Sequence, residues 1–226
     1  AEADGSDCLA KQFVDHQYWP EMQVMCVVLK GAKKDISSTK GMQLSLQTSP
    51  MMKDRTEKIV PARMAEISEA VKAKDFERFA EITMVDSDDL QQVCATTTPV
   101  VKYATDDSFA IIKLVHAFNK AKGKRVLAYT YDAGANAFLF CLKENIAEIV
   151  AMLLHHFPTP EDLLCFNDDS LLAQQKAVEL KPEFKDLIEY EKKPLEFLLQ
   201  SPVGEGPVIY DEKESLIDIE NLKAKQ

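Results

Sequence analysis

RVLAYTYDAGANAFLFCL, residues 125–142, is the stretch that decides the fold. Its two apolar runs, 125–131 and 137–142, have the length and the aromatic content of buried strands. The residues between them, from Asp132 to Asn136, are small or polar and are typical of a tight turn. We therefore expect two successive strands, with a carboxylate at the end of the first one.

Helical patterns lie on both sides of these strands. Residues 106–122 repeat apolar side chains at helical spacing after the capping cluster at 105–107, and Gly123 supplies the stop. Residues 145–157 form a second helix pattern after the second strand. Upstream, the apolar spacing predicts helices around 60–71 and 76–82, separated by a break at 73–74.

The order of the remaining elements indicates the fold class. Residues 8–14 and 22–29 are expected to form two more strands in a hairpin-like arrangement, the second of them buried. After residue 158, short helical patterns alternate with breaks at prolines. Because this order does not repeat a β–α–β unit, we expect an α+β fold, with an antiparallel sheet and packed helices, rather than a doubly wound parallel sheet.

Composition excludes several classes of partner. The chain has 226 residues, with 27 Lys and Arg against 37 Asp and Glu, so its formal net charge is −10. This acidic balance disfavours a general surface for nucleic acid or an anionic membrane. Its longest apolar stretches, such as residues 24–29, are far shorter than the roughly 20 residues that span a bilayer. Residues 1–5 lack the basic and apolar regions of a secretory signal, so we expect a cytoplasmic protein.

Cysteine and histidine usage indicates no metal site. The five cysteines are scattered, odd in number and without a Cys-x-x-Cys pair, which indicates reduced thiols in the core. His155 and His156 end an apolar helix, and His116 lies near the apolar stripe of 106–122. We interpret all three as structural residues and expect no metal ligands.

Two segments differ from ordinary packing sequence. In the first, Lys33 and Lys34 precede Ser37, Ser38 and Thr39 and a helix pattern that starts near residue 42. Ammonium groups, hydroxyls and helix N–H groups together suit a phosphate or diphosphate. Ordinary helix capping with surface lysines explains the same residues.

The second segment is the turn after the strand at 125–131. The Asp132 carboxylate is followed by Ala133 and Gly134, small residues that let a substrate approach, so Asp132 suits a base or a charge-positioning group. An Asx-turn is the alternative interpretation.

Residues 128–137 resemble the Tyr-Thr-Phe-Asp-Ala-Gly-Pro-Asn-Ala segment of mevalonate diphosphate decarboxylases, members of the GHMP kinase superfamily. The resemblance covers nearly the whole chain, and its end resembles the eukaryotic type. Ala135 stands where the family usually has Pro, and Cys8 stands where an Asp-Ser-x-Ala pattern would have Ser. The further segments that match in the same order are Trp19 to Met22, Ser37 to Met42, Thr48-Ser49, Val60 to Arg63, Phe76 to Ser87 and Glu214 to Asp218.

The resemblance implies a GHMP kinase C-terminal domain with a ferredoxin-like core over residues 1–202, followed by a tail at 203–226. The family's Gly/Ser-rich nucleotide loop and its Ser-x-Ser/Ala-Cys-Arg-Ser segment have no counterpart in these 226 residues. The chain is therefore expected to be the C-terminal part of such an enzyme, to lack the N-terminal nucleotide-binding domain and to be inactive alone.

The implied reaction converts mevalonate 5-diphosphate and ATP into isopentenyl diphosphate, carbon dioxide, ADP and phosphate, in isoprenoid and sterol biosynthesis. Mg²⁺ accompanies the nucleotide, and a homodimer is expected. By its match to the family, Asp132 orients or deprotonates the tertiary hydroxyl and then stabilises developing positive charge. The implied substrate-binding residues are Ser38, Thr39, Met42, Lys33, Lys34, Ala133 and Gly134.

Two other functions remain open at the level of sequence. A related GHMP small-molecule kinase would release ADP without carbon dioxide. A non-catalytic binding domain that lacks the nucleotide lobe would release neither.

Overall fold

The computed structural model describes residues 10–30, 35–214, 217–218 and 223–224. The chain divides into a unit of residues 19–203 and a unit formed by 1–18 with 204–226. The described elements of the second unit are a 3₁₀ turn, Glu212–Glu214, and two short antiparallel strands, β6 (Ile217–Asp218) and β7 (Lys223–Ala224). Cys8 and residues 215–216, which take part in the sequence resemblance, lie outside the described residues.

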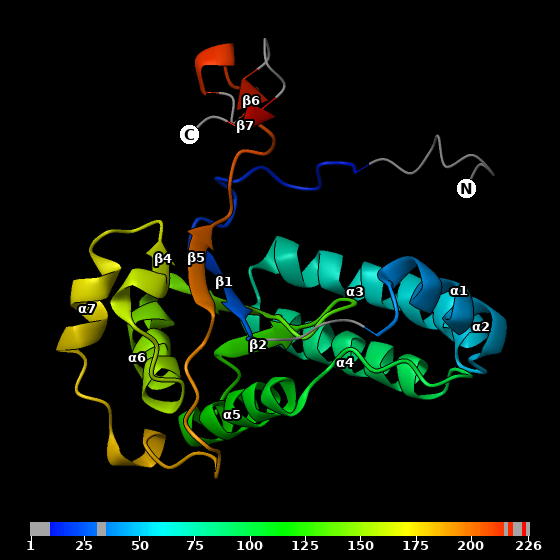
Figure 1. Cartoon of the computed structure of the whole chain (residues 1–226), viewed down its shortest axis with the longest axis horizontal. Helices are drawn as coiled ribbons and strands as arrows, with labels where there is room; N and C mark the ends of the chain where they lie inside the picture. Colours follow the sequence, from blue (N-terminus) through cyan, green and yellow to red (C-terminus); the bar gives the residue numbers. More distant parts are fainter. Residues whose placement is uncertain (1–9, 31–34, 215–216, 219–222, 225–226) are drawn as a thin grey trace. The chain divides into compact units, whose positions relative to one another are not determined.

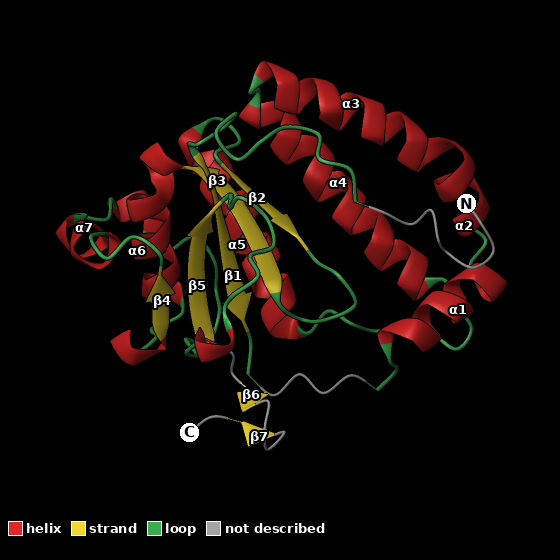
Figure 2. Ribbon diagram, turned by 90° about the horizontal axis from the view of Figure 1, so that it is seen from above, coloured by secondary structure: helices red, strands yellow, loops and turns green. Residues whose placement is uncertain are grey.

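The larger unit is built on a five-stranded sheet with the order β2-β3-β1-β5-β4 (Figure 2). Its strands are β1 (Met22–Val28), β2 (Leu127–Thr130), β3 (Ala137–Leu142), β4 (Leu164–Phe166) and β5 (Phe197–Pro202). β1 is antiparallel to both β3 and β5, and β2 is antiparallel to β3. The expected α+β class is confirmed.

The sheet is mixed, whereas the sequence predicts an antiparallel one. β4 pairs in parallel with β5, with Cys165 opposite Leu199. A parallel pair needs a crossover connection. The chain between these strands supplies one, because it contains helix α7 (Leu171–Ala177) and a 3₁₀ turn at Pro182–Phe184.

The other helices of this unit have the following bounds: α1 Ser38–Thr48, α2 Met52–Asp54, α3 Val60–Ala73, α4 Phe76–Ala95, α5 Asp106–Lys122 and α6 Ile146–His156. A π-helical turn, Arg55–Ile59, joins α2 to α3. Two further 3₁₀ turns are Lys143–Asn145 and Glu161–Leu163.

The helices cover the sheet unequally. α5 and α6 lie along one face (Figures 1 and 2). By strand alternation and register, the fully buried residues Met25, Leu139 and Leu198 share the face opposite to that of Phe140. On the other face, Phe138 and Leu199 remain partly exposed, and Phe140 packs edge-to-face on Phe79 of α4. The main core of the unit therefore lies between the sheet and the helices α5 and α6.

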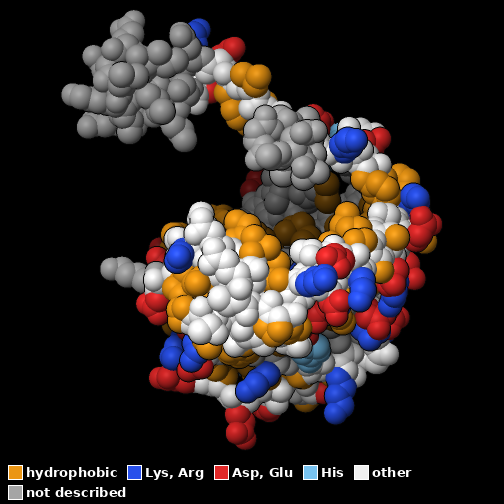
Figure 3. Space-filling view, turned by 90° about the vertical axis from the view of Figure 1, so that its right-hand side faces the viewer, with side chains coloured by type: hydrophobic (Ala, Val, Ile, Leu, Met, Phe, Trp, Pro, Cys, Tyr) orange, Lys and Arg blue, Asp and Glu red, His pale blue; other side chains and the backbone are white. Residues whose placement is uncertain are grey.

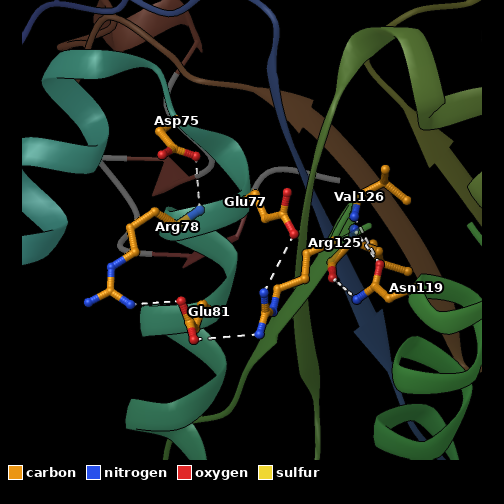
Figure 4. A network of polar contacts seen from close by, with 8 residues as sticks. Asp75, Glu77, Arg78, Glu81, Asn119, Arg125 and Val126 are labelled. Atoms are coloured by element: carbon orange, nitrogen blue, oxygen red, sulfur yellow. Dashed lines mark hydrogen bonds and ion pairs between the residues drawn. The ribbon is translucent and has the colours of Figure 1, made fainter. Parts of the chain in front are cut away.

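Polar contacts fasten β2 to the helices on either side. Arg125 lies 3.5 Å from both Glu77 and Glu81 of α4, while Asn119 of α5 faces Val126 (Figure 4). Arg125 is 41% exposed, so its ion pairs add little stability, whereas the Asn119 side chain is buried.

Most of the predicted helices are confirmed. The break between α3 and α4 occurs at Lys74, which has a positive φ of 52°. α5 has a capping box between Thr105 and Ser108 and ends at Gly123, whose φ is 69°. His116 is hydrogen-bonded to the Tyr129 hydroxyl at 3.1 Å, which fits its structural interpretation.

Two expectations near the start of the chain are wrong. Residues 10–14 form no strand, because both edges of β1 are already paired with β3 and β5. α1 begins at Ser38, four residues earlier than expected, because Ser37 caps the helix by accepting a hydrogen bond from the Lys40 N–H. The first turn is polar, so the apolar pattern starts later than the helix.

The structure also describes the cysteines, the hydropathy of the helices and the charges on one face of the protein. The four described cysteines are free; Cys94 and Cys141 are buried, whereas Cys165 is exposed. In the described part of the chain, no helix is both long enough and apolar enough to cross a membrane. On the face drawn in Figure 3, Lys and Arg side chains lie among Asp and Glu side chains.

Candidate functional site

The turn between β2 and β3 is anchored from three directions. The backbone N–H of Tyr131 donates to the Ser87 hydroxyl of α4 at 3.1 Å. The Ala135 carbonyl accepts from the Ser108 hydroxyl of α5 at 2.8 Å, and the Asn136 side chain accepts from the Leu29 N–H at 3.0 Å. These contacts fix the backbone on both sides of Asp132.

Asp132 itself is exposed. No group in the described part of the chain donates a hydrogen bond to its carboxylate or forms an ion pair with it. Burial, followed by the negative charge of Asp132, raises the pKa of the Cys26 thiol on β1. Burial and the charges of Cys94 and Asp132 raise the pKa of Tyr103. The negative charge of Asp132 therefore raises the pKa of one group on β1 and of one group in the segment before α5. The carboxylate itself remains exposed to solvent.

The small residues after Asp132 are turned toward the protein interior. Gly134 is buried and Ala133 is half-buried. Ala133 packs against a buried cluster formed by Leu44, Cys94, Val101 and Tyr103. This packing leaves Asp132 as the exposed charged group of the turn.

The N-terminus of α1 offers groups suited to an anion. Ser38 and Thr39 are exposed in its first turn, where the helix dipole favours negative charge. Met42, in the second turn, is 60% exposed. Lys33 and Lys34 lie outside the described residues.

Tyr103 brings the two sequence-predicted segments together. Its hydroxyl donates to the backbone carbonyl of Ser37, the N-cap of α1, at 3.2 Å. Its ring belongs to the same buried cluster that Ala133 packs against. The α1 N-terminus and the Asp132 turn are thus joined through one side chain, which sequence analysis missed. Gly41 marks this contact in the structure, because a Cβ at position 41 would lie 2.0 Å from the Tyr103 hydroxyl.

Among the described residues we find neither a glycine turn for nucleotide phosphates nor a cluster of metal-ligating side chains. Within them, no group of three or more His, Cys, Asp or Glu side chains could hold a metal. The described glycines with positive φ are Gly123, at the end of α5, and Gly206, in the smaller unit, so neither forms a phosphate-binding turn between a strand and a helix. The described site thus consists of an exposed carboxylate, Asp132, and the exposed first turn of α1.

Comparison with known proteins identifies the family of this chain. Residues 24–210 match the family model for the mevalonate 5-diphosphate decarboxylase C-terminal domain. The chain is 39% identical over 215 residues to the diphosphomevalonate decarboxylase of Rattus norvegicus, which covers 93% of this chain and 52% of the rat protein. It is 38% identical over 230 residues to that of Ganoderma lucidum, covering 97% of this chain and 56% of the fungal protein.

Solved structures give the same result. Mevalonate diphosphate decarboxylase from Trypanosoma brucei superposes with a TM-score of 0.92 at 59% identity, over 96% of this chain and 58% of that one. A structure of MDDEF in complex with MVAPP, AMPPCP and magnesium superposes with a TM-score of 0.60 at 25% identity, over 65% of this chain and 44% of that one. The chain spans about half the length of the curated relatives it matches.

Proposed function

The chain belongs to the mevalonate 5-diphosphate decarboxylase family, and we propose that it is the C-terminal part of an enzyme that converts mevalonate 5-diphosphate and ATP into isopentenyl diphosphate, carbon dioxide, ADP and phosphate. The observation that carries this proposal is the position of Asp132. Its exposed carboxylate has no protein partner in the described part of the chain and lies on a turn joined through Tyr103 to the N-terminus of α1.

Asp132 is the proposed catalytic residue. The substrate carries a tertiary hydroxyl, which is a poor leaving group. The tertiary carbon is bonded to a methylene carbon that bears the carboxylate. Asp132 orients this hydroxyl or accepts its proton. Transfer of the γ-phosphoryl group of ATP to this oxygen releases ADP and makes phosphate the leaving group. When phosphate leaves, positive charge develops on the tertiary carbon, and a fixed carboxylate stabilises that charge. The electrons of the broken carbon–carbon bond then form the double bond of the product, and the carboxylate leaves as carbon dioxide.

The diphosphate is proposed to bind at the start of α1. Ser38 and Thr39 supply hydroxyls beside the positive end of the helix dipole. We assign positive charge toward the diphosphate to Lys33 and Lys34, and an apolar contact with the substrate to the exposed side chain of Met42. Ala133 and Gly134 are also proposed as substrate-binding residues, because small side chains let a substrate come close to the backbone beside Asp132.

ATP and Mg²⁺ are assigned to residues outside the described part of the chain. The relative solved with MVAPP, AMPPCP and magnesium supports this use of a nucleotide and a divalent ion within the family. The described residues offer no phosphate-binding glycine turn and no group of metal ligands, so no catalytic step is assigned to them through either group.

The organisation of the whole protein is also proposed. Residues 1–202 form the C-terminal domain, 203–226 form a tail, and a nucleotide-binding domain is supplied by the rest of the polypeptide. The division of the chain after residue 203 supports the boundary between domain and tail, whereas the same division groups residues 1–18 with 204–226 and not with 19–203. We further propose a cytoplasmic homodimer that serves isoprenoid and sterol biosynthesis.

The test is simultaneous measurement of ADP and carbon dioxide released by the native-length protein from ATP and mevalonate 5-diphosphate. Asp132→Asn keeps the size of the side chain and removes its charge, so turnover should fall about 100-fold or more while substrate affinity changes much less. Asp162→Asn, on an exposed 3₁₀ turn, is the matched control and should retain activity. Equal losses of turnover and affinity would contradict the role of Asp132.

The same measurement separates the alternatives. Release of ADP without carbon dioxide would assign the protein to the related kinases. Release of neither product by folded native-length protein would favour a non-catalytic binding domain.

A further inference from the structure

We propose that the segment of residues 103–108 is a positioning element that holds the N-terminus of α1 and the Asp132 turn at a fixed separation through the hydroxyls of Tyr103 and Ser108. This inference deepens the proposed function and rests on it. Neither side chain is assigned a contact with substrate, so both are positioning residues. The separation that they set is the one between the diphosphate end and the reacting end of the substrate.

The first contact of this segment is made by Tyr103 on α1. Its hydroxyl donates to the Ser37 carbonyl at 3.2 Å, and the same carbonyl accepts the Gly41 N–H at 2.8 Å. Burial raises the pKa of Tyr103, so at neutral pH the hydroxyl keeps the proton that it donates. Tyr103 is only 8% exposed, which gives its ring little freedom to follow a displaced helix.

The second contact is made by Ser108 on the Asp132 turn. Its hydroxyl donates to the Ala135 carbonyl at 2.8 Å, and its carbonyl accepts from the Tyr131 hydroxyl at 3.0 Å. Ser108 therefore touches residues on both sides of Asp132. The side chain of Ser108 is completely buried, so no water replaces these bonds when they break.

The segment between the two contacts is itself held rigidly. Ser108 accepts from the Thr105 N–H at 3.1 Å, and the Thr105 hydroxyl accepts from the Ser108 N–H at 3.2 Å. This reciprocal pair is the capping box that starts α5. Tyr103 lies two residues before the box, so a shift at one contact is transmitted to the other through a short, hydrogen-bonded backbone.

Apolar packing closes the space between α1 and the turn. Leu44 of α1 and Ala133 of the turn both pack in the cluster that contains Tyr103. Loss of the Tyr103 hydroxyl leaves this cluster in place. A Tyr103→Phe variant is therefore expected to remain folded while the start of α1 becomes less tightly held.

Steady-state kinetics of the native-length protein test the two contacts separately. Tyr103→Phe should raise the KM for mevalonate 5-diphosphate about tenfold, because the diphosphate-binding end is displaced, and should change kcat less than about threefold. Ser108→Ala should lower kcat about tenfold with a smaller change in KM, because it frees the turn that carries Asp132.

Tyr129→Phe is the matched control. It removes the hydroxyl of a fully buried tyrosine, and that hydroxyl bonds Asp88 and His116 but neither α1 nor the turn. It should lower the Tm without changing kcat or KM. If all three variants lose activity only in proportion to their loss of Tm, the positioning role of Tyr103 and Ser108 is wrong.

Hydrogen exchange gives a readout that does not require turnover. In Tyr103→Phe, amides in the first turn of α1 and in residues 131–136 should both exchange faster than in the wild type, and inorganic diphosphate should protect α1 less. Unchanged exchange at both places would overturn the positioning role. If the two proteins differ in exchange as expected but the wild type releases no carbon dioxide, the positioning role stands and only the proposed reaction is contradicted.

Discussion

Asn119 of α5 and Leu127 of β2 are joined by two hydrogen bonds that close a ring: the Asn119 amide donates to the Leu127 carbonyl at 2.7 Å and its oxygen accepts from the Leu127 N–H at 3.0 Å. The same oxygen accepts from the Val126 N–H at 2.9 Å. One buried amide thus satisfies three backbone groups at the start of β2, and it sets where this strand begins relative to α5.

Replacing Asn119 by Ala should lower the free energy of unfolding by about 2–4 kcal/mol, because buried backbone groups lose their partners. Urea denaturation measures the change. Asn167→Ala, at an exposed position, is the control and should change the free energy by less than about 0.5 kcal/mol. A small effect at Asn119 would mean that water replaces the amide.

Gly41→Ala should destabilise the protein through Tyr103. A Cβ at position 41 would lie 2.0 Å from the Tyr103 hydroxyl, which is buried and hydrogen-bonded. We expect a loss of about 1–3 kcal/mol. The Tyr103→Phe background removes the clashing oxygen, so the same substitution should cost less there. Equal costs in the two backgrounds, measured by urea denaturation, would show that the helix moves instead.

Asp86→Asn should weaken the packing of α3 and its preceding π-helical turn on α4. The Asp86 carboxylate accepts from Arg55 at 2.8 and 3.0 Å and from Arg63 at 2.9 Å. Because Asp86 is 39% exposed, the expected loss at neutral pH is modest, about 1–2 kcal/mol. Asp54→Asn, which breaks the exposed pair with Lys58, should cost less than about 0.5 kcal/mol.

The stabilising effect of Asp86 should disappear in acid. Burial acts to raise the pKa of its carboxyl, but the hydrogen bonds and charges of Arg55 and Arg63 outweigh burial and lower the pKa below 3.8. Its contribution is therefore complete above pH 3.8 and is lost as the pH falls through the lower native value. The difference between wild type and Asp86→Asn should shrink over the same interval. A constant difference would contradict this explanation.

His156 should make stability depend on pH in mildly acidic solution. It is buried, and its Nε2 lies 3.2 Å from the Phe184 carbonyl. Burial, assisted by the charges of His155 and Lys192, lowers its pKa below 6.5. The unfolded chain then binds the proton more readily, so stability falls as the pH drops below 6.5.

Substitution by Gln tests this dependence, because the Gln amide can donate to the Phe184 carbonyl but does not titrate. The free energy of unfolding of His156→Gln should fall less than that of the wild type between pH 7 and pH 5. Parallel pH profiles would assign the dependence to another group.

Local sequence signals predicted the helices well. The limits of α5 follow from Thr105 and Gly123, and the break after α3 follows from the interrupted apolar pattern. Strand pairing was less predictable, because it depends on which partner takes each edge. The failure at residues 10–14 and the parallel pairing of β4 both come from contacts between distant parts of the chain.

In the candidate site, too, local motifs were predictable from sequence, whereas contacts between distant parts of the chain were not. Motif resemblance selected Asp132, Ser38 and Thr39, and the structure places their two segments on either side of Tyr103. Tyr103 carries no motif of its own, since its role depends on the missing side chain of Gly41, far away in sequence. The catalytic and binding roles of the selected residues remain predictions that the kinetic experiments test.

The central position of β1 in the sheet determines how late during translation the sheet can close. Met25, at the centre of β1, pairs with Leu139 on one side and with Gln200 on the other. The first of these partners, β3, is translated more than 100 residues after β1, and the second, β5, is translated only near the end of this unit. Until then its unpaired edges can recruit other chains. Polypeptides truncated before β5 should consequently aggregate or require chaperones, whereas those that extend past Pro202 should be able to close the sheet.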